Sequence, residues 1–205
     1  MGKGIDTPEN PVGVLADIKA DGNDFIGMYY FQKSAYKTLL TKEIATAISD
    51  AGLYIVSIYE NAYPTSVDYF SEPRGTSDAT AAIDCAISVG QPKGTPIYFT
   101  VDCDIIPSAV IQYFKVVSSY VRSSGYTSGV YGSGTVCMAL KALVLVSHTW
   151  LSGSKGWSGY WECYPHADII QSLPTSGIWG NPYGRLNNYD TDVTPRESGG
   201  GWKIR

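Results

Sequence analysis

The chain has 205 residues, of which 44% are hydrophobic, and a formal net charge of -4, so it can bury one sizeable core. The negative charge argues against a nucleic-acid footprint, and no run of about 18 apolar residues is present to cross a membrane. We therefore expect a monomer that binds neither nucleic acid nor a membrane.

Short apolar runs alternate with helical patterns through the first half of the chain. The helical patterns place apolar residues three or four apart, and capping residues such as Thr41 and Gly52 mark their ends. Thr76 or Ser77 is expected to cap the third helix. Strands are predicted over 4–6, 25–30, 53–59 and 96–102, and helices around 12–18, 43–51, 79–87 and 107–125.

The second half continues the alternation, but its helical patterns weaken after residue 150. One further helix is predicted over 136–144, whereas the Gly/Ser/Trp-rich segment 152–161 has no clear helical pattern. Strands are predicted over 127–131, 148–151, 167–171 and, within 186–194, an eighth.

This alternation of strand and helix predicts parallel strands joined by crossover helices, which is the α/β class. Eight strands favour a single-domain (β/α)8 TIM-like barrel, irregular because helices in the last third are short or missing. An open, doubly wound sheet is the competing architecture. We expect one domain over 1–205, with an ordered core at about 2–195 and a flexible Gly-rich tail at 196–205.

The segment Ile97–Asp104 is the most informative part of the chain. It is a nearly continuous apolar run that ends in Asp102 and Asp104, as expected for a strand buried on both faces. The acids therefore lie at the carboxyl end of an inner strand, where α/β folds build their sites. A purely structural alternative is that both acids cap the next helix or bind loop amides.

Acids stand at four of the eight predicted strand ends. In a closed barrel the first and last strands are neighbours, so Asp6 and Asp190 should lie close together, and so should Glu60 and Asp102 on adjacent strands. Close carboxylates repel and raise a pKa, which suits a general acid beside an ionised partner, as in glycoside hydrolysis. Helix capping or pairing with arginine is the structural alternative. The remaining strand ends carry Tyr29, Tyr131, Trp150 and Gln171.

Other chemistries fit the sequence poorly. Ser133 lacks the glycine spacing of a nucleophile elbow, and neither His148 nor His166 has a metal-binding partner at helical spacing. No phosphate loop or dinucleotide fingerprint is present, so we expect no metal and no cofactor. The four cysteines have no zinc or thioredoxin spacing, although a disulfide that includes Cys103 stays open.

Several segments together are similar to a known family. These are Gly4-Ile5-Asp6, residues 51–60, Ile97–Asp104, Gly129-Val130-Tyr131-Gly132-Ser133 and Trp150-Leu151. From about residue 2 to 194 the chain resembles the bacterial and phage glycoside-hydrolase-like domain of uncharacterised function. That domain is related to the family 25 lysozymes, which are muramidases with an irregular (β/α) barrel.

The resemblance implies site residues. The family's acids match Asp6, then Asp102 with Asp104, and then Asp190 or Asp192. The lysozyme general acid is a glutamate where this chain has Asp104, so Glu60 is an alternative proton donor. Five residues are expected to bind substrate, of which the three aromatic ones would stack on sugar rings: Tyr29, Tyr131, Trp150, Gln171 and Asp192.

The leading hypothesis is a peptidoglycan glycoside hydrolase of lysozyme type, which acts as a cell-wall lysin or an antibacterial toxin. The alternative is a non-catalytic glycan-binding barrel, whose acids only hydrogen-bond sugar hydroxyls. The N-terminus has no apolar signal-peptide core. We therefore expect synthesis in the cytoplasm and action at the bacterial wall or periplasm after phage lysis, toxin delivery or non-classical export.

Overall fold

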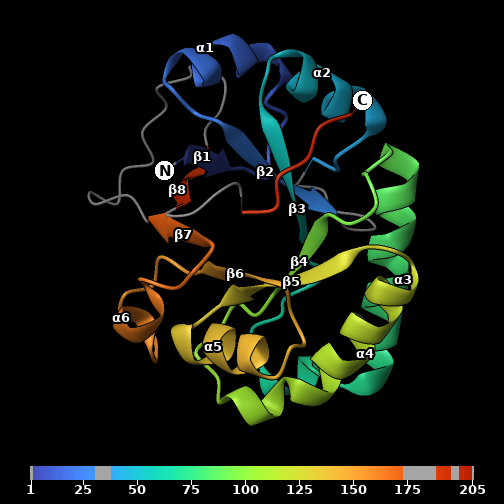
Figure 1. The fold of residues 1–205 in the computed structure, drawn as a ribbon, viewed down its shortest axis with the longest axis vertical. Helices are drawn as coiled ribbons and strands as arrows, with labels where there is room; N and C mark the ends of the chain where they lie inside the picture. The colour runs from blue at the N-terminus through green and yellow to red at the C-terminus, as the bar shows by residue number, and fades with distance from the viewer. Residues whose placement is uncertain (1, 31–37, 173–187, 195–198, 205) are drawn as a thin grey trace.

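The computed structural model describes residues 2–30, 38–172, 188–194 and 199–204, and its strands close into a barrel (Figure 1). The eight strands follow one another around the barrel in chain order, which confirms the TIM-like barrel and excludes the open sheet. The strands are β1 (Gly2–Asp6), β2 (Phe25–Tyr30), β3 (Tyr54–Tyr59), β4 (Pro96–Thr100), β5 (Thr127–Gly132), β6 (His148–Leu151), β7 (Ile169–Ser172) and β8 (Asp190–Thr194).

The last strand departs from the predicted all-parallel arrangement. Strands β1 to β7 pair in parallel, but β8 is antiparallel to both β7 and β1. An antiparallel strand needs no crossover connection, which suits the weak helical pattern late in the chain. The reversal brings the first residue of β8, Asp190, level with the last residue of β1, Asp6.

Helices cover the outside of the barrel, and α3 and α4 lie side by side on one flank (Figure 1). Within the described residues, no helix is both long and apolar enough to cross a bilayer. The helices are η1 (Val12–Val14), α1 (Leu15–Ala20), α2 (Lys42–Asp50), η2 (Val67–Tyr69), α3 (Glu72–Val89), η3 (Pro107–Ala109), α4 (Ile111–Ser123), α5 (Gly134–Ala142) and α6 (Tyr160–Cys163).

Helix α3 begins more than one turn earlier than predicted. Its N-cap is Ser71, whose side-chain oxygen accepts a hydrogen bond from the Arg74 backbone N–H, so the predicted caps Thr76 and Ser77 are wrong. A proline in the first turn has no N–H to lose and a φ suited to a helix start, which explains the earlier beginning. The helix ends at Gly90, whose φ of 81° is the left-handed conformation that glycine adopts readily at helix C-termini.

The core has two parts, because barrel strands point side chains alternately inward and outward. The large outer part lies between the strands and the helices. A smaller cluster belongs to inward-facing positions and supports the floor of the barrel mouth: Phe25, Val56, Ile58, Tyr98, Trp150 and Ile169.

The C-terminal segment packs against the barrel, so the predicted flexible tail is wrong for residues 199–204. Trp202 is 3% exposed, forms an antiparallel bridge with Ile55, and donates its indole N–H to Ser57 Oγ at 2.9 Å. The Tyr98 hydroxyl donates to the Gly199 carbonyl at 2.6 Å. The glycine content favoured flexibility, but one buried indole anchors the segment. The remainder of the predicted tail, 196–198 and 205, lies outside the described residues.

Candidate active site

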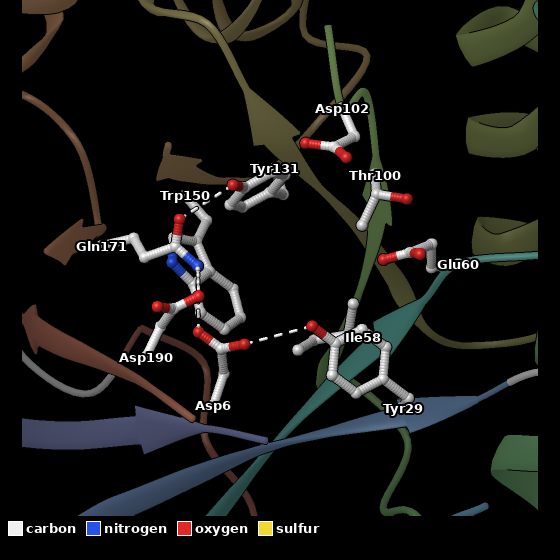
Figure 2. A pocket seen from close by; sticks show the side chains of 10 residues that line it. All are labelled: Asp6, Tyr29, Ile58, Glu60, Thr100, Asp102, Tyr131, Trp150, Gln171 and Asp190. Atoms are coloured by element: carbon white, nitrogen blue, oxygen red, sulfur yellow. Dashed lines mark hydrogen bonds between the residues drawn. The ribbon is translucent and has the colours of Figure 1, made fainter. Parts of the chain in front are cut away.

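A pocket of about 170 Å³ opens at the carboxyl ends of the parallel strands (Figure 2). Its lining combines acids from four strands with aromatic and amide side chains, and it includes eight of the ten residues predicted for the site. The lining residues are Asp6, Tyr29, Ile58, Glu60, Thr100, Asp102, Tyr131, Trp150, Gln171 and Asp190.

Asp6, at the end of β1, forms one side of the pocket base and is 3% exposed. The Tyr29 hydroxyl donates to its Oδ1 at 3.1 Å, and Gln171 Nε2 donates to its Oδ2 at 3.1 Å. Its neighbour across the β1–β2 pair is Gly27, where a Cβ would lie 2.7 Å from the Asp6 Cβ and 2.8 Å from the Trp150 ring. The glycine thus leaves the space that the acid and the indole occupy.

Gln171 connects the acids on this side of the pocket. Its Nε2 lies 3.1 Å from Asp6 Oδ2 and 3.1 Å from Asp190 Oδ2, so one amide group donates to both carboxylates. Its Oε1 accepts from the Tyr131 hydroxyl at 2.8 Å and from the Gly153 backbone N–H at 3.2 Å. These donors fix the amide with its N–H groups toward the acids.

Asp192 lies beneath the pocket rather than in its lining. It is 1% exposed, and the Trp150 indole N–H donates to its Oδ1 at 3.0 Å. Burial, followed by the charges of Asp6 and Asp190, raises the Asp192 pKa well above its usual value. Its Oδ2 has no donor within the described residues, and a protonated Asp192 can donate to Asp6. Burial therefore disfavours the charged form of Asp192.

Asp6, Asp190 and Asp192 differ in their environments, so their pKa values are shifted to different extents. Burial, followed by the charge of Asp6, raises the pKa of Asp190 to about 7. Burial also raises the Asp6 pKa, but hydrogen bonds from Gln171, Tyr29 and Asp192 oppose it. The ionised form of Asp6 is the one that these donors stabilise. The base of the pocket therefore combines a hydrogen-bonded Asp6 with an Asp190 that gains or loses a proton readily near neutral pH.

The opposite wall carries the second pair of acids. Figure 2 shows Glu60, Thr100 and Asp102 along the ends of β3 and β4, across the pocket from Asp190 and Gln171. Glu60 is half-buried and Asp102 is exposed. The predicted proximity of the two acids is thus confirmed to the extent that both line one small pocket.

The structure does not bring Asp104 to the pocket. Its carboxylate accepts the Ser158 backbone N–H at 3.1 Å and the Ser158 hydroxyl at 2.9 Å, and it ties the β4–α4 loop to the β6–α6 loop. Residues two positions apart point to the same face of a sheet only while they belong to a strand, and β4 ends at Thr100. Asp102 and Asp104 lie in the loop after the strand, so their two-residue spacing does not make them point the same way.

The three aromatic residues predicted to stack on sugars differ in their exposure. Trp150 lines the floor, but it is 1% exposed and packs edge-on against Tyr98 with ring centroids 5.5 Å apart, so it offers no face to a sugar. Tyr29 and Tyr131 are half-buried at the mouth. Burial, followed by the charge of Asp6, raises the pKa of Tyr29 well above its usual value, so the Tyr29 hydroxyl remains a hydrogen-bond donor.

Two lining residues were not predicted. Ile58 and Thr100 lie within β3 and β4, two positions after the inward-facing Val56 and Tyr98, so strand alternation turns them inward as well. That period of two was the signal that could have found them. Within the described residues, no three His, Cys, Asp or Glu side chains form a group that could hold a metal ion.

A family model described as the Rv2525c-like, glycoside hydrolase-like domain matches residues 16–201 of this barrel. This chain belongs to that family. A Rv2525c-like protein of known structure, the Tat-secreted Rv2525c of Mycobacterium tuberculosis in complex with L-tartrate, matches with a TM-score of 0.82 at 20% identity. The match covers 98% of both chains.

The fold is shared with lysozymes of known structure. The bacterial lysozyme from Streptomyces coelicolor matches with a TM-score of 0.58 at 13% identity, over 95% of this chain and 92% of that chain. The uncharacterized protein YbfG of Bacillus subtilis (strain 168) is 35% identical over 125 residues, which are 55% of this chain and 17% of that protein. The Rv2525c-like chain thus spans a small part of that relative, and its resemblance to muramidase barrels is confirmed.

Proposed function

We propose that this chain is a glycoside hydrolase that cleaves the glycan strands of bacterial peptidoglycan, in the manner of a muramidase. The observation that carries the proposal is the pairing of Asp190, whose pKa is raised to about 7, with a hydrogen-bonded Asp6 in one pocket. Glycosidases need two carboxyl groups in different protonation states at neutral pH.

The pocket offers two candidate proton donors and two candidate ionised carboxylates. Asp190 or Glu60 would protonate the leaving oxygen, while Asp6 or Asp102 would stabilise the positive charge that develops on the sugar ring. Asp104 takes no part in this scheme, because Ser158 already occupies its carboxylate. Tyr29 and the amide of Gln171 would hold the ionised acid in place.

Pocket size limits how the substrate would bind. A volume of about 170 Å³ is below the roughly 300–1,000 Å³ of sites that enclose a drug-sized ligand. We infer that a single sugar unit enters and that the rest of the glycan lies across the barrel mouth. The muramidase fold of the structural relatives supports peptidoglycan as the substrate, and action at the bacterial cell wall follows from that substrate.

A non-catalytic glycan-binding barrel is the second candidate. The occupied carboxylate of Asp104, at the position of the family 25 general acid, favours it. In that case the four lining acids would accept hydrogen bonds from sugar hydroxyls without transferring protons.

Release of reducing ends from purified peptidoglycan separates the two candidates. A hydrolase releases them, and both Asp190→Asn and Asp6→Asn should then lower the rate by about a hundredfold or more. Asp84→Asn, an exposed acid on the outer face of α3, is the matched control and should leave the rate unchanged. Sedimentation of the protein with peptidoglycan, without release of reducing ends, would instead support the binding barrel.

A further inference from the structure

The segment Asn61–Pro64 leaves the barrel directly after Glu60 and is held at both ends. At its start, the Asn61 carbonyl oxygen lies 2.8 Å from the Tyr69 hydroxyl and accepts from Arg74 Nη2 at 3.1 Å. At its end, the Pro64 carbonyl accepts the Asp102 backbone N–H at 2.9 Å. The segment, called the arm below, therefore links the two acids of one pocket wall.

The arm has an unfavourable backbone conformation. Ala62 has a φ of 57°, in the left-handed region, which costs a non-glycine residue about 1–2 kcal/mol. Strain of this kind persists only where surrounding contacts enforce it, and it concentrates at functional sites. The next residue, Tyr63, is 82% exposed, so its ring is open to solvent within the segment that follows Glu60.

A buried network outside the barrel contacts the start of the arm. Its centre is Asp78 of α3, which is 0% exposed and accepts hydrogen bonds from three tyrosine hydroxyls and from Arg74 Nε at 3.1 Å. The tyrosine donors are Tyr59 at 3.2 Å, Tyr69 at 2.8 Å and Tyr113 at 2.9 Å. Of these four donors, Tyr69 and Arg74 contact the Asn61 carbonyl, and Tyr59 has a side-chain hydrogen bond with Asn61. Tyr113 has no described contact with the arm.

We propose that Tyr69 and Arg74 are positioning residues, which fix the Asn61 carbonyl and thereby hold Glu60 in the pocket wall. This inference rests on the proposed function, because it assigns the arm to a glycan site. Asp78 supplies the rigidity: a buried carboxylate with four donors keeps Tyr69 and Arg74 in one orientation. Displacement of a reacting group by about 1 Å can lower a rate by a factor of 10².

The network contains its own control. Tyr69→Phe and Tyr113→Phe each remove one hydroxyl that donates to Asp78, but only Tyr69 also contacts the arm. Arg74→Lys keeps a cation beside Asp78 but loses the planar fork that reaches Asp78 and Asn61 together. We expect similar decreases in Tm for the two Phe variants. We expect kcat on peptidoglycan to fall about tenfold for Tyr69→Phe and Arg74→Lys, and to stay within twofold of wild type for Tyr113→Phe.

Equal kcat values for Tyr69→Phe and Tyr113→Phe would overturn the inference and leave the proposed function intact. If the wild type binds peptidoglycan without cleaving it, the hydrolase proposal fails. The arm is then tested by affinity: a several-fold weaker Kd for Tyr69→Phe alone supports it, and equal Kd values overturn it. A wild type that neither binds nor cleaves glycan overturns both proposals.

Discussion

Asp190 lies opposite Asp6 in the β1–β8 ladder, and the two carboxylates share the side-chain amide of Gln171 at 3.1 Å each. The antiparallel direction of β8 creates this pairing, because it brings the beginning of one strand to the end of the other. Two like charges so close, in a half-buried site, cannot both ionise easily, and the amide lowers the cost for the acid that does.

The first prediction is a pH profile. If Asp190 is the proton donor, it must be protonated to act, and its pKa is raised to about 7. The rate of peptidoglycan cleavage should therefore fall as the pH rises through about 7. Initial rates between pH 5 and 9 measure this. A rate that stays constant to pH 9 would assign proton donation to another group.

The second prediction concerns stability. Asp190 has a folded-state pKa above its ordinary value, so the stability it contributes is present below about pH 4 and is lost as the pH rises through about 7. Asp190→Asn removes this loss, while its amide oxygen can still accept from Gln171. Because Asp190 is partly exposed, we expect its substitution to raise the free energy of unfolding by only about 1 kcal/mol, less than the full pKa shift would give. That gain raises Tm by about 2–4 °C. Melting curves should therefore favour the variant at pH 8 and nearly coincide with wild type at pH 4.

The barrel and its acids could be predicted because both follow from periodicity. Apolar runs separated by helical stripes predict parallel strands, and strand ends share one face of a barrel. That reasoning placed Asp6, Glu60, Asp102 and Asp190 around one pocket. It found Asp190 although it treated β8 as parallel, because Asp190 is the first residue of a strand that runs the other way.

Contacts beyond the strands could not be predicted from the sequence. Whether Asp104 follows Asp102 into the pocket depends on where β4 ends, and Ser158, 54 positions away, decides its direction. The buried state of Trp150 likewise depends on Asp192 and Tyr98, which come from other strands. No local pattern in the sequence encodes such distant pairs.

The third prediction tests the packed C-terminal segment. Trp202 is buried, and its indole donates to Ser57 Oγ, which itself donates to Gln91 Oε1 at 2.8 Å. Trp202→Ala should cost about 3–5 kcal/mol of unfolding free energy, the usual range for a large buried aromatic residue. Urea denaturation measures the loss. An unchanged midpoint of denaturation would instead support the predicted flexible tail. Lys203→Ala, at the half-buried residue that follows Trp202, is the control.

The last prediction separates the two acids that follow β4. Asp102 lines the pocket, whereas Asp104 accepts three contacts from Ser158 at 2.9–3.1 Å. Asp102→Asn is nearly isosteric, so the fold should remain and stability should equal or exceed that of wild type, since active sites trade stability for function. Peptidoglycan cleavage should fall by about a hundredfold or more if Asp102 acts in the chemistry.

Asp104→Ala should behave in the opposite way. It removes charge-assisted hydrogen bonds that join two loops, at an exposed position where such bonds contribute about 1 kcal/mol. We expect a lower Tm and a nearly unchanged rate per folded molecule. Both variants should be melted and assayed from one preparation each. A destabilised, fully active Asp102→Asn would remove Asp102 from the mechanism, and a stable, inactive Asp104→Ala would return Asp104 to it.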